Sequence, residues 1–308
     1  MARLTSGGRP TAIALLLTVV VGVLAVSTAG VLTRFAMDAA GRFDGLFAVA
    51  LAAGRLLVAA LLLGPVWVEL GRSRDRTHPL AYGFAIAAGL LLALHFGCWM
   101  ASLAYTTVAA STVLVTTNSI WIALIQWLIG QGRPSPKTGL GIAVALGGSA
   151  VLALGSGDAG ESAIAAQPLL GNSLALVGAI AASGYLILGQ KAQGAGLSVQ
   201  GYAAIAYGTA ALALIPLPIL GGVPVTEQPP AVYGWLVAMA VVPQVVGHTS
   251  LNWSMRWLSP ALVALAILFE PVGASLLAWL WLGEVPSAAT GLGAIAIGGG
   301  VILATRDR

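Results

Sequence analysis

The stretch Thr138-Gly139-Leu140-Gly141, followed by Gly147-Gly148, returns 152 positions later as Thr290-Gly291-Leu292-Gly293, followed by Gly299-Gly300. A shift of 152 residues is close to half of the 308-residue chain, so the chain is predicted to consist of two related halves. The same shift aligns three further pairs: Pro134 with Pro286, Ser135 with Ser287, and Asn118 with Glu270.

The composition indicates that the solvent of most of this chain is lipid. Hydrophobic residues make up 58% of it and charged residues 8%, whereas a soluble domain carries about 25% charged residues. The 40 glycines are typical of closely packed membrane helices. The single cysteine, Cys98, excludes a disulfide framework. Most basic residues lie between apolar runs, so the basic pI does not indicate nucleic-acid binding.

Ten apolar segments can be read from the sequence, each near the ~20 residues that a helix needs to cross the hydrocarbon core. The acidic, glycine-rich stretch from Gly155 to Gln167 is the natural boundary between two sets of five. The first segment follows Arg3 and Arg9 as a signal peptide would, but its removal would break the symmetry of five plus five. The segments are 12–33, 44–68, 79–103, 107–129, 138–156, 169–189, 198–220, 231–254, 259–282 and 287–304.

The distribution of Lys and Arg predicts the orientation. With the N-terminus inside, eleven basic residues fall inside and only Arg34 and Arg42 fall outside. Because each half has an odd number of segments, the second half must enter the membrane from the opposite side, as an inverted repeat. Such a chain is typical of a transporter whose site lies between its halves. The inside residues are Arg3, Arg9, Arg72, Arg74, Arg76, Arg133, Lys137, Lys191, Arg256, Arg306 and Arg308.

Seven runs along the sequence form a recognisable set: Asn252-Trp253-Ser254 to Trp257, Leu268-Phe269-Glu270-Pro271-Val272, Trp281-Leu282-Gly283-Glu284, Gly291 to Leu303, Ser102 to Thr107, Ala109-Ala110-Ser111 and Gly54-Arg55. Together they resemble the drug/metabolite transporter superfamily, and in particular its bacterial EamA-type ten-helix exporters. One departure is that Gly130-Gln131 stands where the family usually has Gly-Glu.

This resemblance implies an all-α integral membrane fold with ten transmembrane helices as two inverted five-helix repeats. We expect the first repeat at 1–156, a linker loop at 157–167 and the second repeat at 168–308. The protein is expected in the inner or plasma membrane with both termini cytoplasmic, as a monomer or homodimer. Members of the family move amino acids, amines, nucleotide sugars, organic acids and drugs, so the resemblance leaves the substrate open.

Glu270 is the clearest acidic candidate for the site. It lies within the segment 259–282 and precedes Pro271, which removes a backbone donor and frees a carbonyl near Ile267. Broken helices at mid-membrane expose polar backbone to substrate in many transporters. Glu270 could couple a proton or bind an ammonium group, or it could form a fixed ion pair. Its repeat equivalent, Asn118, could share a bridging substrate with it.

Arg55 is the only basic residue placed within a predicted membrane helix. A lone Arg there costs about 2.5–3.5 kcal/mol on insertion scales, so it must face protein or a water-filled cavity. It could contact a carboxylate in the cavity, or it could be structural and bond helix-end carbonyls. Its repeat equivalent is Thr209.

Polar residues recur at helical spacing in two more segments. His95 and Trp99 lie on one face of the segment 79–103, and His248 and Asn252 lie on one face of 231–254. Such stripes face a substrate path or bond neighbouring helices. We expect a cavity lined by the first four segments of the first half and by the sixth to the ninth, with the glycine-rich fifth and tenth outside it.

The function predicted is a secondary carrier or facilitator that exports a small metabolite, an amino acid or a related amphipathic compound, by alternating access. A drug, amine or nucleotide-sugar transporter of the same fold is the alternative, and an intramembrane enzyme is a weaker one. No catalytic residue, metal site or cofactor is predicted, and the partners are the substrate, the bilayer and, where transport is coupled, a proton. The predicted substrate-binding residues are Arg55, His95, Trp99, Asn118, His248, Asn252 and Glu270, and Glu270 is also the candidate for proton coupling.

Overall fold

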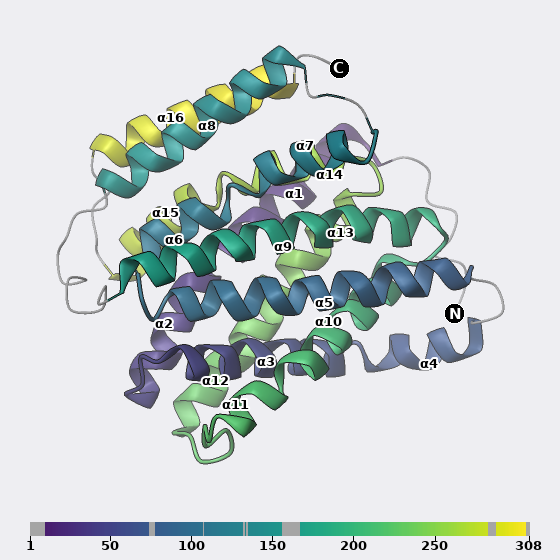
Figure 1. Ribbon diagram of the computed structural model, residues 1–308, viewed down its shortest axis with the longest axis vertical. Helices are drawn as coiled ribbons and strands as arrows, with labels where there is room; N and C mark the ends of the chain where they lie inside the picture. Colours follow the sequence, from purple (N-terminus) through teal and green to yellow (C-terminus); the bar gives the residue numbers. More distant parts are fainter. Residues whose placement is uncertain are drawn as a thin grey trace.

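The computed structural model describes residues 10–73, 78–106, 108–131, 133, 135–155, 167–282 and 288–305, and within them every regular element is a helix (Figure 1). The fold is therefore all-α, as predicted. Several residues used above lie outside the described ranges: Arg3, Arg9, Arg74, Arg76, Arg306, Arg308, Glu284, Pro134, Pro286, Ser287 and nearly all of the linker 157–167.

The first half follows the predicted segments, and three of its five segments are built from two successive helices. Its helices are α1 (Ala12–Ser27) and α2 (Ala29–Ala40), α3 (Gly45–Leu62) and α4 (Gly64–Ser73), α5 (Pro79–Ser102), α6 (Val108–Val115) and α7 (Asn118–Leu128), and α8 (Pro136–Gly155).

The second half repeats this order, with a π-helix, η2, inside its third segment. Its helices are α9 (Pro168–Gly194), α10 (Val199–Leu214) and α11 (Pro216–Leu220), α12 (Pro230–Met239), η2 (Ala240–His248) and α13 (Thr249–Ser254), α14 (Pro260–Ile267) and α15 (Glu270–Leu282), and α16 (Ala288–Thr305).

Seven helical runs in the described chain are long and apolar enough to cross a membrane. Two shorter apolar helices, Pro260–Ala274 and Gly291–Ala304, follow them. Large apolar side chains lie exposed on the outside, which lipid tolerates and water does not favour; Leu169, Leu212 and Leu220 expose 82%, 72% and 85% of their surface. The count of ten membrane-crossing helices remains a prediction.

The helix starts follow local sequence chemistry, and equivalent starts in the two halves use the same device. The Asp44 side chain accepts a hydrogen bond from the Phe47 amide at the start of α3, at 2.8 Å. Ser198 accepts one from the Gly201 amide at the start of α10, at 3.0 Å. Each satisfies a backbone donor that a first helical turn leaves unpaired.

The broken spans repeat with the sequence. The span α6–α7 breaks at Thr116 and Thr117, and α14–α15 breaks at Leu268 and Phe269. The shift of 152 residues that aligns the glycine motifs carries the first break onto the second. Asn118 and Glu270 thus begin equivalent helices, which places both beside an interruption of the backbone.

The repeat-equivalent helices α8 and α16 pack side by side at one end of the molecule (Figure 1). A Cβ added at Gly141 would lie 2.5 Å from the carbonyl oxygen of Gly300, and one at Gly148 would lie 2.7 Å from that of Gly293. Positions early in α8 therefore face positions late in α16, so the two helices run in opposite directions. These glycines allow the close backbone contact that the sequence predicted.

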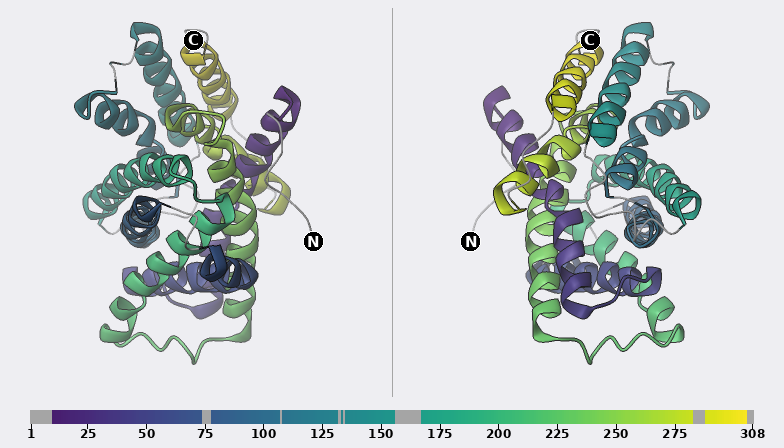
Figure 2. Two further views of the ribbon diagram at one scale, coloured as in Figure 1. Left: turned by 90° about the vertical axis from the view of Figure 1, so that its right-hand side faces the viewer. Right: turned by 90° about the vertical axis from the view of Figure 1, so that its left-hand side faces the viewer.

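The remaining helices pack around a central region. The long helices α5 and α9 lie side by side, and α3 packs against α10 (Figure 1). On the other side, α1 packs against η2 and α13, and α2 packs against α12 (Figure 2). These contacts join the two halves along their length, so the central region is bounded by helices of both.

Candidate functional site

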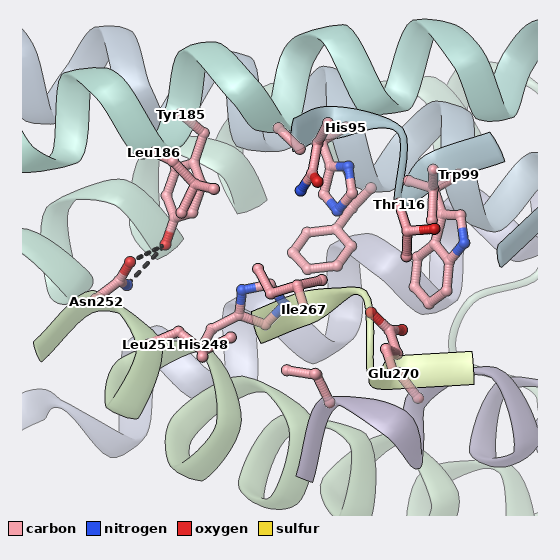
Figure 3. Close-up of a pocket in the computed structure, with 16 residues that line it drawn as sticks. His95, Trp99, Thr116, Tyr185, Leu186, His248, Leu251, Asn252, Ile267 and Glu270 are labelled. Carbon is pink, nitrogen blue, oxygen red and sulfur yellow. Dashed lines mark hydrogen bonds between the residues drawn. The ribbon is translucent and has the colours of Figure 1, made fainter. Parts of the chain in front are cut away.

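A cavity lies in the central region, lined by the continuous helices α5 and α9 and by broken spans of both halves (Figure 3). It is lined from both halves of the chain. Six of the seven predicted site residues lie on its wall: His95, Trp99, Asn118, His248, Asn252 and Glu270.

Glu270 stands at the start of α15, directly after the break at Leu268 and Phe269. Pro271 has no amide hydrogen, so the carbonyl of Ile267 loses its helical donor. The positive end of the α15 dipole favours a carboxylate at this position. In Figure 3 the Glu270 carboxylate points into the cavity toward Trp99. Within the described chain it makes no hydrogen bond or ion pair, so it is available to a ligand.

Asn118 occupies the equivalent start of α7. Its backbone carbonyl accepts a hydrogen bond of 3.0 Å from the Ser183 hydroxyl of α9, which fixes this end of the helix. Its side-chain oxygen is buried and has no partner among the described residues. An unpaired buried amide oxygen is costly, so this atom is a second acceptor that lacks a donor, on a residue that lines the cavity.

His95 is oriented by the neighbouring helix. Its Nδ1 lies 2.9 Å from the Gly178 carbonyl oxygen of α9. A carbonyl only accepts, so this bond places the ring proton on Nδ1 and leaves the Nε2 lone pair as a hydrogen-bond acceptor. The Trp99 ring is parallel to the His95 ring to within 1°, with ring centroids 6.1 Å apart. The two rings give α5 a flat aromatic surface on the cavity.

Phe96, between these two residues in sequence, forms the rest of this wall. Its ring meets the His248 ring edge-on, with centroids 5.2 Å apart. His248 also meets the Tyr185 ring, at 6.5 Å. His248 makes no hydrogen bond to another described residue, so its ring nitrogens remain open to a ligand or water.

Arg55 does not lie on the cavity wall. Its side chain is fully buried behind Phe96, with the guanidinium carbon 4.2 Å from the centroid of the Phe96 ring. Its Nε and Nη2 donate to the Gln244 side-chain oxygen of η2 at 3.0 and 2.7 Å. No N–O distance of 4.0 Å or less joins Arg55 to Glu270 in the described chain. The fixed ion pair considered for Glu270 is therefore not formed with Arg55.

The end of the cavity opposite Glu270 is closed by a polar contact between α9 and α13 (Figure 3). The Tyr185 hydroxyl lies 2.9 Å from the side-chain oxygen and 2.7 Å from the side-chain nitrogen of Asn252. Behind it, the Gln193 amide donates to the Asn252 carbonyl at 3.0 Å. Asn252 is thus engaged within the protein, unlike Glu270 and Asn118.

Sixteen residues line the cavity, and among those outside the predicted set the aromatic or polar ones are Phe96, Thr116 and Tyr185. Tyr185 carried a usable signal, since a hydroxyl in the middle of an apolar segment needs a buried partner. Thr116 could have been found because it begins the polar run Thr116-Thr117-Asn118-Ser119 within an apolar segment. Phe96 had no signal, because one more apolar ring in a membrane helix is ordinary.

The cavity wall also differs from the predicted set of helices. The second and seventh segments, which contain α3 and α10, contribute no lining residue. They pack against each other behind α5 instead. The fifth and tenth segments, α8 and α16, contribute no described residue to the wall, as the sequence predicted. Fewer segments therefore line the cavity than the sequence predicted.

The arrangement can hold a small molecule by charge, hydrogen bonds and aromatic contact. The described residues contain no group of three or more His, Cys, Asp or Glu side chains placed to hold a metal ion. The cavity lies between apolar helices and is lined by residues from two related halves. This arrangement is typical of a membrane transporter.

The comparison with protein families agrees with this class. The model of the EamA-like transporter family matches the chain twice, at residues 13–154 and 169–306. The chain belongs to the EamA-like transporter family. The two matches fall on the two related halves.

Known proteins give two further comparisons. The chain is 38% identical over 88 residues to the thiamine-repressible mitochondrial transport protein THI74 of Saccharomyces cerevisiae (strain ATCC 204508 / S288c); this region is 29% of the chain and spans only 24% of that relative. A solved structure titled "Crystal structure of protein" is similar with a TM-score of 0.71 and 19% identity, covering 96% of this chain and 97% of that one. That similarity shows the fold.

Proposed function

We propose that this protein is a secondary carrier that exports a small amphipathic metabolite from the cell by alternating access. The observation that carries the proposal is the cavity between the two halves, where each broken span presents an unpaired acceptor, Asn118 or Glu270. A substrate held between equivalent positions can be released to either side when the halves rock around it.

The architecture proposed for this carrier is two inverted five-helix repeats that span the membrane ten times, with both termini in the cytoplasm. The opposite directions of α8 and α16, which are repeat equivalents, support the inversion. The division at 157–167 and the location in the inner or plasma membrane belong to the same proposal.

The substrate proposed is a metabolite with a protonated amine, an amino acid or a related compound. Glu270 is the partner of the ammonium group, because it lines the cavity and has no competing partner in the described chain. His95, Asn118 and His248 supply hydrogen bonds, and Trp99 packs against an apolar side chain. Opposite charge offsets the cost of removing an ammonium group from water.

The amine-type alternative from the sequence stands as a second candidate. The observation that favours it is the position of Arg55. The sequence suggested that this residue could contact a substrate carboxylate, but Phe96 covers it. Without a cation on the described part of the wall, an amine with no carboxylate fits as well as an amino acid does.

Counterflow in proteoliposomes tests the proposal. Purified protein should exchange labelled amino acids or amines across the bilayer, and Glu270→Gln should reduce the exchange at least tenfold while the protein stays folded. Glu227→Gln is the matched control, since Glu227 is an exposed loop carboxylate. Exchange that is equal in all three proteins would remove Glu270 from the site, and no exchange of any amine-bearing metabolite would contradict the carrier function as stated.

A further inference from the structure

We propose that Phe96 is a specificity-determining residue: by covering Arg55, it makes the cavity select aromatic amine cations over the zwitterionic amino acids of the same shape. The inference rests on the proposed carrier function and narrows its substrate class.

The first step concerns the charges that face the cavity. Glu270 is the acidic residue on the wall, and the described lining contains no Lys or Arg. A zwitterion that enters this space can place its ammonium group at Glu270 and finds no cationic partner for its carboxylate. A buried carboxylate without such a partner is strongly disfavoured. An amine cation lacks this penalty.

The second step concerns Arg55, the basic residue that lies behind the cavity wall. Arg55 lies fully buried and directs two of its nitrogens to one neutral oxygen of Gln244. Its Nη1 and the Gln244 side-chain nitrogen have no partner among the described residues. Guanidinium groups bind carboxylates more readily than they bind amides. Arg55 is thus equipped to take a carboxylate but lies out of reach of one.

The third step is the barrier between them. The Phe96 ring lies against the Arg55 guanidinium at 4.2 Å, and the same side chain is part of the cavity wall. An aromatic face stabilises a guanidinium, and here it also closes that group to the cavity. The His248 edge contact and the position of Phe96 between His95 and Trp99 hold the ring in place.

The fourth step is the shape of the ligand. The parallel rings of His95 and Trp99, together with Phe96 and Tyr185, line the cavity with aromatic surface. A flat aromatic body gains contact on such a wall. The matching ligand joins an aromatic ring to an ammonium group, so tryptamine is the probe and tryptophan is the same compound with a carboxylate added.

Isothermal titration of the purified full-length chain in nanodiscs measures the selectivity directly. The natural protein should bind tryptamine at least tenfold more tightly than tryptophan. Phe96→Ala opens a path to Arg55 and should bring the ratio to unity or below by strengthening tryptophan binding. Phe96→Leu, which keeps an apolar cover, should retain the preference for tryptamine, as should the distant control Glu227→Gln.

Several results would overturn the inference. They are tighter binding of tryptophan than of tryptamine by the natural protein, binding of neither probe, and equal weakening of both probes in a folded Phe96→Ala protein. If Phe96→Ala does not fold, the ratio in the natural protein and in Phe96→Leu still decides the matter. Counterflow of tryptamine is measured separately, so that selective binding without exchange counts against the carrier function alone.

Discussion

At the scale of single residues, the cavity keeps some polar groups free and engages others. Glu270 and Asn118 line the cavity; the Glu270 carboxylate and the buried Asn118 side-chain oxygen have no partner in the described chain, whereas Asn252 is bonded to Tyr185. The free groups are suited to a ligand that leaves, and the engaged ones to holding helices together. This difference leads to two predictions.

The first prediction is a pH dependence that belongs to Glu270. Only the ionised carboxylate attracts a cation, so amine binding should strengthen as the pH rises through the titration of Glu270 and then level off. The other titratable groups on the described wall are His95 on α5, His248 on η2 and, at the opposite end, Tyr185 on α9; Arg55 of α3 lies behind Phe96. All four remain in Glu270→Gln, so the difference between the two binding profiles isolates Glu270. A rise that persists unchanged in Glu270→Gln would assign it to another group.

The second prediction concerns Tyr185. Tyr185→Phe removes a hydroxyl that bonds buried Asn252 and leaves that amide unsatisfied, which should lower the free energy of unfolding by about 1–3 kcal/mol. Thermal unfolding in detergent measures the change. Tyr233→Phe, on α12, removes an exposed hydroxyl that bonds the backbone of the preceding loop at Val225 and Gln228; water replaces the lost bonds there, so this change should cost less. Equal effects would mean that the contact of Tyr185 with Asn252 contributes little.

The sequence could predict that Glu270 lines the cavity, but it could not predict that Arg55 lies behind the wall. Glu270 is placed by its own sequence, because Pro271 breaks the helix locally. Arg55 is placed by a ring from another helix, since Phe96 covers it, and no spacing within its own segment reveals that. The same reason explains why His95 could be predicted to share a face with Trp99 while its bond to Gly178 could not.

At the scale of helices, both continuous and broken elements line the cavity. The cavity is lined by the continuous helices α5 and α9 and by three spans that are broken, at Thr28, at Thr116 and Thr117, and at Leu268 and Phe269. The π-helix η2, which contains Pro243, also contributes to the lining. Irregular backbone of this kind is common at functional sites. The break before Glu270 and Pro271 could be predicted from the proline, whereas η2 was not predicted, although Pro243 lies inside it.

The third prediction tests the glycine contact between α8 and α16. In Gly141→Ala the new Cβ would lie 2.5 Å from the Gly300 carbonyl oxygen, so the helices must separate at a cost of about 1–3 kcal/mol. Gly147→Ala is the matched control on the same helix, since its Cβ would meet nothing within 4 Å. It should be neutral or slightly stabilising. A destabilisation shared by both variants would point to helix propensity and not to the contact.

At the scale of the whole molecule, two related halves enclose one cavity. The repeat in the sequence predicted this duplication because the motif Thr138 to Gly148 returns at a fixed distance, and the broken spans follow the same distance. The set of lining helices was predicted too broadly. Periodicity shows that α3 and α10 are apolar, but it does not tell a helix facing the cavity from one facing a neighbour.

The fourth prediction is the topology. If each half crosses the membrane five times, reporter fusions at Gly157 and at Arg308 should report opposite sides, with Arg308 in the cytoplasm. The physical reason is the excess of basic residues predicted on the inner side. Paired alkaline phosphatase and fluorescent protein fusions make the measurement, because each is active on only one side. Reports from the same side at both positions would rule out five crossings per half.

The central claim is that the cavity opens to each side of the membrane in turn, and the accessibility of one cavity residue from both sides tests it most directly. Asn118→Cys in a Cys98→Ala background should react with a membrane-impermeant thiol reagent added to right-side-out vesicles and, separately, to inside-out vesicles. A transported amine should slow both reactions, while Ala145→Cys, buried where α8 packs against α16, should stay unlabelled. Labelling of Asn118→Cys from one side only, or from neither, would contradict the account.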